Sequence, residues 1–160
     1  MFAIGAWGAL ASCQPMPSEG EQDRQASESS DEGDTFACGT PEDSDIYRVG
    51  LWHEGSRVRV AFVDAFPAPP QLYDNTWIIS ITDLDGVPLN DAGVEVLPSM
   101  PIHGHKGSVP SEVRSMEQPG QYQLDPVYLA MAGLWAVELR ITETDALAHD
   151  TVTFTFCIEP

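Results

Sequence analysis

Residues 135–141 read WAVELRI and residues 151–158 read TVTFTFCI, and in both stretches apolar and polar side chains alternate. Consecutive side chains of a β-strand point to opposite faces, so this two-residue period predicts strands that bury one face only. Shorter runs with the same period occur at 58–62, 77–81, 94–96 and 122–124. An antiparallel sandwich has this pattern, because each of its sheets buries one face against the other.

The residues between these runs favour turns. Asp85-Gly86 predicts a hairpin and Pro119-Gly120 predicts a turn. No window of helical length sustains an apolar stripe with a 3.6-residue period. Seven or so short strands in about 115 residues are typical of an immunoglobulin-like fold. We therefore expect an all-β protein, an immunoglobulin-like antiparallel β-sandwich of about seven strands, over residues 36–160.

Composition limits the class of partner. The chain has 160 residues, of which 42% are hydrophobic, enough for one domain with its own core and an N-terminal extension. It carries 25 acidic and 7 basic residues, a formal charge of −18. Such a surface repels phosphate backbones, so we expect no nucleic-acid binding. The charge favours solubility, a cation or a basic partner.

The N-terminal segment resembles an export signal. Residues 1–12 carry no charge and end in small residues, and Leu10-Ala11-Ser12-Cys13 resembles a bacterial lipobox. We expect 1–12 to be a lipoprotein signal segment and Cys13 to be lipidated, which would attach the protein to a membrane. No Lys or Arg stands near Met1, so we expect the true start to lie further upstream. The alternative is an apolar strand with a buried Cys13.

Residues 18–34 carry seven acids, one arginine and no large apolar side chain. Such a segment cannot bury enough apolar surface to offset the entropy of ordering, so we expect 13–35 to be an acidic disordered tether. An acidic interaction tail is the alternative. Gln14, rather than an aspartate, follows Cys13. This resembles exported lipoproteins of the cell envelope that are anchored in the outer membrane, facing the periplasm or the cell surface.

Cys38 and Cys157 flank the region expected to fold. Such a pair predicts a disulfide and an oxidising compartment, with two free thiols as the alternative. Cys157 lies opposite the aliphatic face of its strand, so the bond would not cross the core. It would instead hold the segment after the tether against the last strand and add about 4 kcal/mol in the chain-entropy model.

Several short segments between Asn75 and Ile141 together resemble one known family. These are Asn75-Thr76-Trp77, Asp83-Leu84-Asp85-Gly86-Val87-Pro88-Leu89, Met100-Pro101-Ile102-His103-Gly104-His105, Pro119-Gly120-Gln121-Tyr122 and Met131-Ala132-Gly133-Leu134-Trp135. The resemblance is to the YtkA-like and FixH-like family of small exported β domains. It implies an immunoglobulin-like fold and an occurrence around copper and heavy-metal handling, in some members together with cytochrome-oxidase assembly. Many members have no assigned activity.

Met100, His103 and His105 lie within six residues, on an expected loop between strands. Imidazole suits divalent copper or zinc, and thioether suits monovalent copper. Met131 is a candidate fourth ligand if the two loops meet, and Met116 is a weaker one. We therefore predict a copper site formed by Met100, His103, His105 and Met131. The alternative is a loop that these residues shape without any metal.

No motif of an enzyme is present: the sequence lacks a nucleophile elbow, a phosphate-binding glycine loop and a metalloprotease helix. Electron-transfer copper needs a thiolate beside two histidines, and both cysteines of the expected domain are expected to be paired. Two functions therefore remain. The first is a lipid-anchored envelope protein that carries or senses copper. The second is a structural or protein-interaction module without metal, whose partner the sequence does not identify.

Overall fold

The computed structural model describes Cys38, residues 43–143 and residues 149–160. The expected signal segment, the tether and Cys13 lie outside the described residues. In the described part the chain forms nine strands and no α-helix, and accordingly no helix there could cross a membrane. The strands are β1 Trp52–Glu54, β2 Val58–Phe66, β3 Tyr73–Asp83, β4 Gly93–Met100, β5 His105–Lys106, β6 Glu112–Ser115, β7 Gln121–Leu129, β8 Gly133–Thr142 and β9 Asp150–Ile158.

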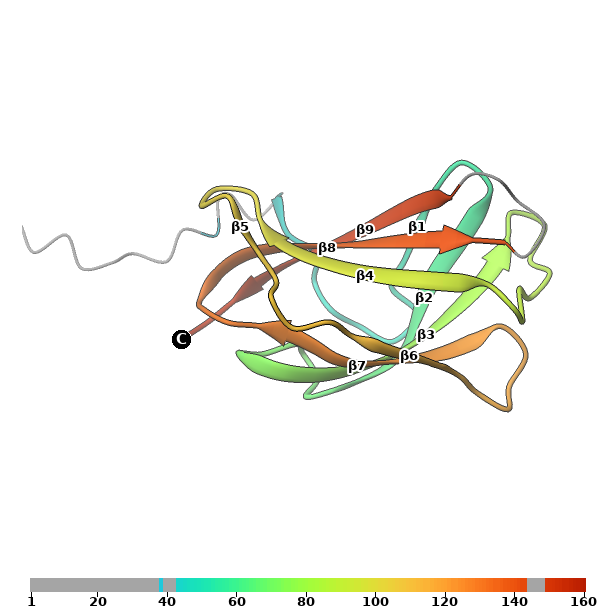
Figure 1. Ribbon diagram of the computed structural model, residues 1–160, viewed down its shortest axis with the longest axis horizontal. Helices are drawn as coiled ribbons and strands as arrows, with labels where there is room; N and C mark the ends of the chain where they lie inside the picture. The colour runs from blue at the N-terminus through green and yellow to red at the C-terminus, as the bar shows by residue number, and fades with distance from the viewer. Residues whose placement is uncertain (1–37, 39–42, 144–148) are drawn as a thin grey trace, which may run out of the picture. The chain divides into compact units, whose positions relative to one another are not determined.

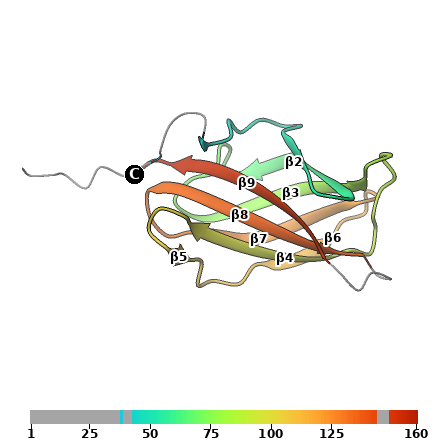
Figure 2. The same cartoon turned by 90° about the horizontal axis from the view of Figure 1, so that it is seen from above.

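The strands form two sheets that face each other (Figures 1 and 2). One sheet has the order β1-β2-β3-β7-β6 and the other has the order β5-β4-β8-β9. All pairs within the sheets are antiparallel. The architecture is the predicted immunoglobulin-like antiparallel β-sandwich.

The core lies between the two sheets and follows the alternation of the sequence. On β8 the side chains of Trp135, Val137, Leu139 and Ile141 are buried, and on β9 every second side chain from Val152 to Ile158 is buried. Aromatic rings fill the centre in edge-to-face pairs, as between Phe62 and Trp77. Such pairs add to the stability that the burial of apolar area provides.

The strands differ from the expectation in two details. The structure has nine strands rather than about seven, because β1, β5 and β6 have two to four residues each and are too short to show a period. Asp85-Gly86 forms a tight turn with one bridge, between Thr82 and Pro88. The chain then passes to the other sheet rather than completing a hairpin. A turn signal is local and does not determine which sheet the next strand joins.

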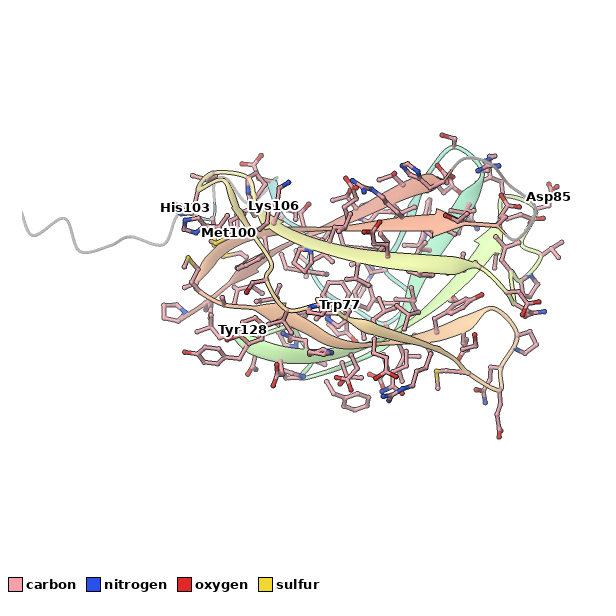
Figure 3. The ribbon with its side chains drawn as sticks, in the orientation of Figure 1. Trp77, Asp85, Met100, His103, Lys106 and Tyr128 are labelled. Carbon is pink, nitrogen blue, oxygen red and sulfur yellow. A yellow bond between two sulfur atoms is a disulfide. The ribbon has the colours of Figure 1, made fainter. Side chains whose placement is uncertain are left out.

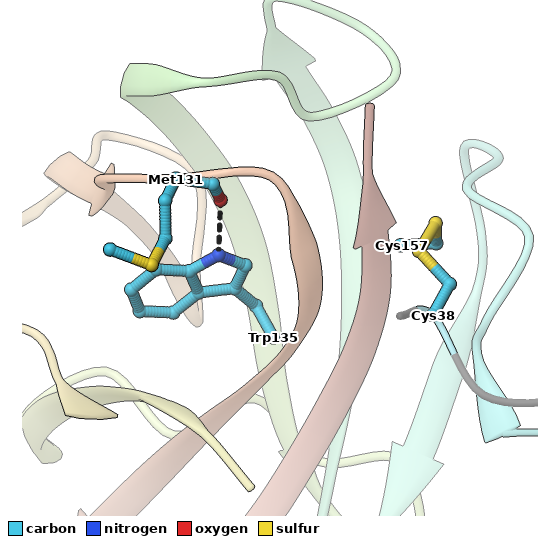
Figure 4. The surroundings of a disulfide bond; sticks show 4 residues. All are labelled: Cys38, Met131, Trp135 and Cys157. Atoms are coloured by element: carbon cyan, nitrogen blue, oxygen red, sulfur yellow. Dashed lines mark hydrogen bonds between the residues drawn. A yellow bond between two sulfur atoms is a disulfide. The ribbon is translucent and has the colours of Figure 1, made fainter. Parts of the chain in front are cut away.

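Cys38 and Cys157 form a disulfide with a sequence separation of 119 residues (Figure 4). Cys157 lies on β9 between the buried Phe156 and Ile158, and is itself only partly buried. Nearby, the backbone N–H of Asp45 donates to the Thr155 carbonyl at 2.6 Å. The Asp45 carboxylate accepts from the Thr155 N–H at 2.8 Å. These contacts hold the segment before β1 along the outside of β9.

Candidate metal centre

The predicted ligands of the histidine-rich segment lie on one hairpin. Its strands pair Ser99 with Lys106 and Met100 with His105. Only 101–104 therefore form a loop, and Met100 and His105 belong to strands rather than to the loop that the sequence suggested. The Met100 carbonyl accepts from the N–H groups of His103 at 3.2 Å and Gly104 at 2.8 Å. Gly104 has a φ of 66°, a left-handed conformation that glycine adopts without strain.

The hairpin register places one thioether beside one imidazole. Residues directly opposite each other on antiparallel strands have side chains on the same face, with their Cβ atoms about 5 Å apart. Met100 is fully buried, at 0% exposure, so this face is the one that points into the core. His105 shares the face but is exposed, because β5 lies at the edge of the sheet. The pair therefore joins a buried sulfur to an accessible ring.

The second histidine of the loop lies near the first. The ring centroids of His103 and His105 are 6.1 Å apart and their planes differ by 29°. Two imidazoles that share one ion, with bonds of about 2.0 Å, have centroids separated by at most about 6.3 Å. The observed separation is just below this limit, so one ion could lie between two ring nitrogens in a nearly linear arrangement, and a tetrahedral site would require the rings to move closer together. Both rings are exposed, and Figure 3 shows His103 at the same end of the sandwich as Met100.

Met131 lies in the turn between β7 and β8 and is 42% exposed. This turn and the β4–β5 hairpin lie at the same end of the sandwich (Figure 1). The Met131 carbonyl accepts a hydrogen bond of 2.9 Å from Nε1 of Trp135. In Figure 4 the Met131 side chain folds back so that its sulfur lies beside the indole. The turn thus brings a second thioether to this end of the molecule.

Met116, the weaker candidate, does not belong to this group. It precedes the β6–β7 turn, and its N–H donates to the carbonyl of Gln121, where β7 begins. Met131 follows the other end of β7. A strand of nine residues spans about 30 Å. Met116 is therefore far too distant to join an ion at the hairpin.

Residues 100–106, which include the hairpin loop, contain no Asp or Glu, so they offer no carboxylate ligand. The described residues contain no group of three or more His, Cys, Asp or Glu side chains that could hold a metal. Lys106, which follows His105, adds a positive charge at the hairpin. The donor groups at this end of the sandwich are the thioethers of Met100 and Met131 and the two imidazoles, and none of them is a carboxylate or a thiolate.

The remaining histidines lie elsewhere. His53 on β1 contacts the Asp45 carboxylate through Nε2 at 2.8 Å and packs against the ring of Phe154. His149 is exposed and precedes β9, at the end of the sheet away from the hairpin. Trp135 is a residue of this region to which sequence patterns assigned no role, although it lies four residues after Met131.

The chain resembles known proteins in sequence over part of its length and in fold more widely. Residues 54–140 match the family model described as YtkA-like. No curated protein sequence matches significantly. A DUF4426 family protein from Pseudomonas aeruginosa PAO1 has a similar fold, with a TM-score of 0.50 and 15% identity over 69% of this chain and 97% of that one.

Two structures of FetP from uropathogenic Escherichia coli strain F11 are also similar. The protein as isolated has a TM-score of 0.45 and 12% identity over 69% of this chain and 94% of FetP. A copper-bound variant has a TM-score of 0.46 and 13% identity over 70% of this chain and 96% of FetP. Similarities this weak support no argument about function, which must come from the residues of this chain.

Proposed function

We propose a function for this chain from the premise that it belongs to the YtkA-like family, whose model covers more than half of its length. The protein is a copper-binding protein of the cell envelope that carries or senses the ion. The observation that supports this most directly is the pair of exposed imidazoles, His103 and His105, with ring centroids 6.1 Å apart. Their hairpin also pairs His105 with Met100.

Met100, His103, His105 and Met131 would hold the ion. The two imidazoles would bind at the surface, and the Met100 thioether would bind from the core side of the hairpin. Met131 would close the site from the neighbouring turn. This set of nitrogen and soft sulfur donors suits copper better than magnesium or calcium, which require oxygen ligands. The ion is cargo in this proposal, so no catalytic step is assigned to any residue.

The sequence and the disulfide support the proposed location. Cys13 would carry the lipid after removal of 1–12, and 13–35 would connect this anchor to the sandwich of 36–160. Disulfides such as Cys38–Cys157 persist in oxidising compartments, which supports export to the envelope. An anchor in the outer membrane would place the copper site in the periplasm or at the cell surface.

The test is a titration of the purified chain with Cu(I) and Cu(II) separately, in competition with a chelator of known affinity. We expect one copper ion per chain in the wild type. In the double variant His103→Ala/His105→Ala we expect affinity to fall by about a hundredfold or more, because both nitrogen ligands are lost. The control is His149→Ala, which removes an exposed histidine at the other end of the sheet and should leave affinity unchanged.

Equal copper affinity of the wild type and the double variant would contradict the proposed site. The protein would then be better explained as a structural or protein-interaction module. In that case the buried Met100 would serve only as a side chain that fills the core.

A further inference from the structure

We infer that Trp135 is a positioning residue for Met131, and that the arrangement makes the site selective for monovalent copper. The inference rests on the proposed copper site and assigns a role to a side chain outside the predicted ligand set. It adds the oxidation state of the bound ion, which the two imidazoles alone leave open.

Trp135 is fixed by the core and in turn fixes the turn before β8. Its side chain is 2% exposed, and it pairs across β8 and β9 with the buried Phe156. Its Nε1–H donates to the Met131 carbonyl at 2.9 Å. Indole nitrogen can only donate, so this bond sets where the Met131 backbone lies. Because the core holds the indole, this hydrogen bond fixes the backbone position from which the Met131 side chain extends.

A buried tryptophan of this core does not require a hydrogen bond like the one that Trp135 donates to Met131. Trp77 is 0% exposed, and its Nε1 has no hydrogen-bond partner in the structure. Both indoles fill the same core, yet only Trp135 directs its N–H to a turn. This contrast distinguishes a packing role, which both share, from a positioning role, which belongs to Trp135.

Trp135 also lies beside the buried thioether. The β4–β8 register pairs Ser99 with Ala136. Met100 and Trp135 are the next residues on their strands beyond this last pair, and both side chains are buried. Met100 in turn pairs with His105. Met131 lies beside the same indole (Figure 4). Two thioethers are therefore associated with this indole: Met100 at the end of β4, and Met131 in the turn before β8.

The donor types favour monovalent copper. The four donors include no carboxylate or thiolate, and Lys106 adds a positive charge at the hairpin. Thioethers prefer Cu(I) over divalent ions. The selectivity for Cu(I) therefore depends on Met131 being held in place.

The experiment compares Cu(I) and Cu(II) affinities of the full chain in three variants. Met131→Leu keeps the size and loses the sulfur, whereas Trp135→Phe keeps an aromatic ring and loses the donor. We expect both to weaken Cu(I) binding by about tenfold or more, as for residues that orient a ligand, and to change Cu(II) binding by less than about twofold. Trp77→Phe is the matched control and should leave both affinities unchanged.

The outcomes separate the two proposals. A wild type that binds no copper overturns the proposed function, and this inference with it. A wild type that binds Cu(I) through His103 and His105, with equal affinity in Met131→Leu, overturns the inference alone. Cu(I) affinity that is equal in a folded Trp135→Phe variant also overturns it.

A measurement on the wild type serves where Trp135→Phe does not fold. We expect the indole N–H signal of Trp135 in a nitrogen–proton NMR spectrum to shift on addition of one equivalent of Cu(I). The signal of Trp77, assigned with Trp77→Phe, should remain in place. A Trp135 signal that does not move while Cu(I) binds contradicts the inference.

Discussion

Asp150 is the only charged side chain among the described residues that is buried. Its carboxylate accepts from the backbone N–H groups of Ser56, Arg57, Val58 and Thr151 at 2.7–3.1 Å. Burial raises the pKa of this carboxyl, but the four hydrogen bonds outweigh burial and hold the pKa below its ordinary value of 3.8. The carboxylate thereby joins the β1–β2 turn to the start of β9.

Asp150→Asn should lower the free energy of unfolding by about 2–3 kcal/mol at pH 7, because an amide cannot accept all four bonds. The folded pKa of Asp150 lies below the unfolded one, so its contribution is complete above the unfolded pKa of about 4 and declines as pH falls toward the folded pKa. The difference in free energy of unfolding between wild type and variant, measured by urea unfolding, should therefore become smaller in acid. A difference that is constant from pH 7 down to pH 3 would contradict this account. Asp74→Asn, at an exposed position, is the control.

The types of donor in the candidate site could be predicted from the sequence, but their placement could not. The close spacing of three metal-binding residue types, Met100, His103 and His105, is enough to predict them as candidate ligands. That Met100 ends a strand and is buried depends on the register with β5, a strand of two residues without any periodic signal. The bond between Trp135 and Met131 depends on how the core holds the indole, which spacing does not reveal.

The β4–β5 hairpin determines how far apart the two imidazoles lie. Gly104 and Gly86 both have positive φ angles, of 66° and 86°, and an added Cβ at either would meet no atom within 4 Å. Alanine at either position should thus cost only backbone strain, about 1–2 kcal/mol. We expect Gly104→Ala to weaken copper binding, because the strain moves His103 relative to His105.

Gly86→Ala is the matched control for this prediction, since the Asp85-Gly86 turn is remote from the hairpin. It should cost similar stability in thermal unfolding and leave copper affinity unchanged. If the two variants change copper affinity equally, the geometry of the hairpin is not what positions the ligands.

Long strands were predicted well because burial of one face imposes a period over many residues. The alternation at 135–141 and 151–158 predicted β8 and β9 and the side chains that they bury. The short strands and the passage of the chain between sheets after Asp85-Gly86 were not predicted. These features depend on contacts between segments that are distant in sequence.

The two ends of the sandwich have different roles. At one end Asp150 fastens the β1–β2 turn to β9. At the other end the β4–β5 hairpin and the β7–β8 turn carry the thioethers and the imidazole pair. The hairpin lies within one sheet and the turn connects the two sheets, so a site formed here could hold its ligands in place without a large rearrangement. This arrangement suits a protein that binds an ion tightly and presents it at the surface.

The most direct test of the copper site is X-ray absorption spectroscopy of the chain loaded with one equivalent of Cu(I). The account predicts about two sulfur and about two nitrogen ligands around the ion, as two thioethers and two imidazoles provide. Met131→Leu should remove one of the sulfur ligands. A copper ion surrounded only by nitrogen and oxygen in the wild type would show that Met100 and Met131 do not bind it, and would contradict the account.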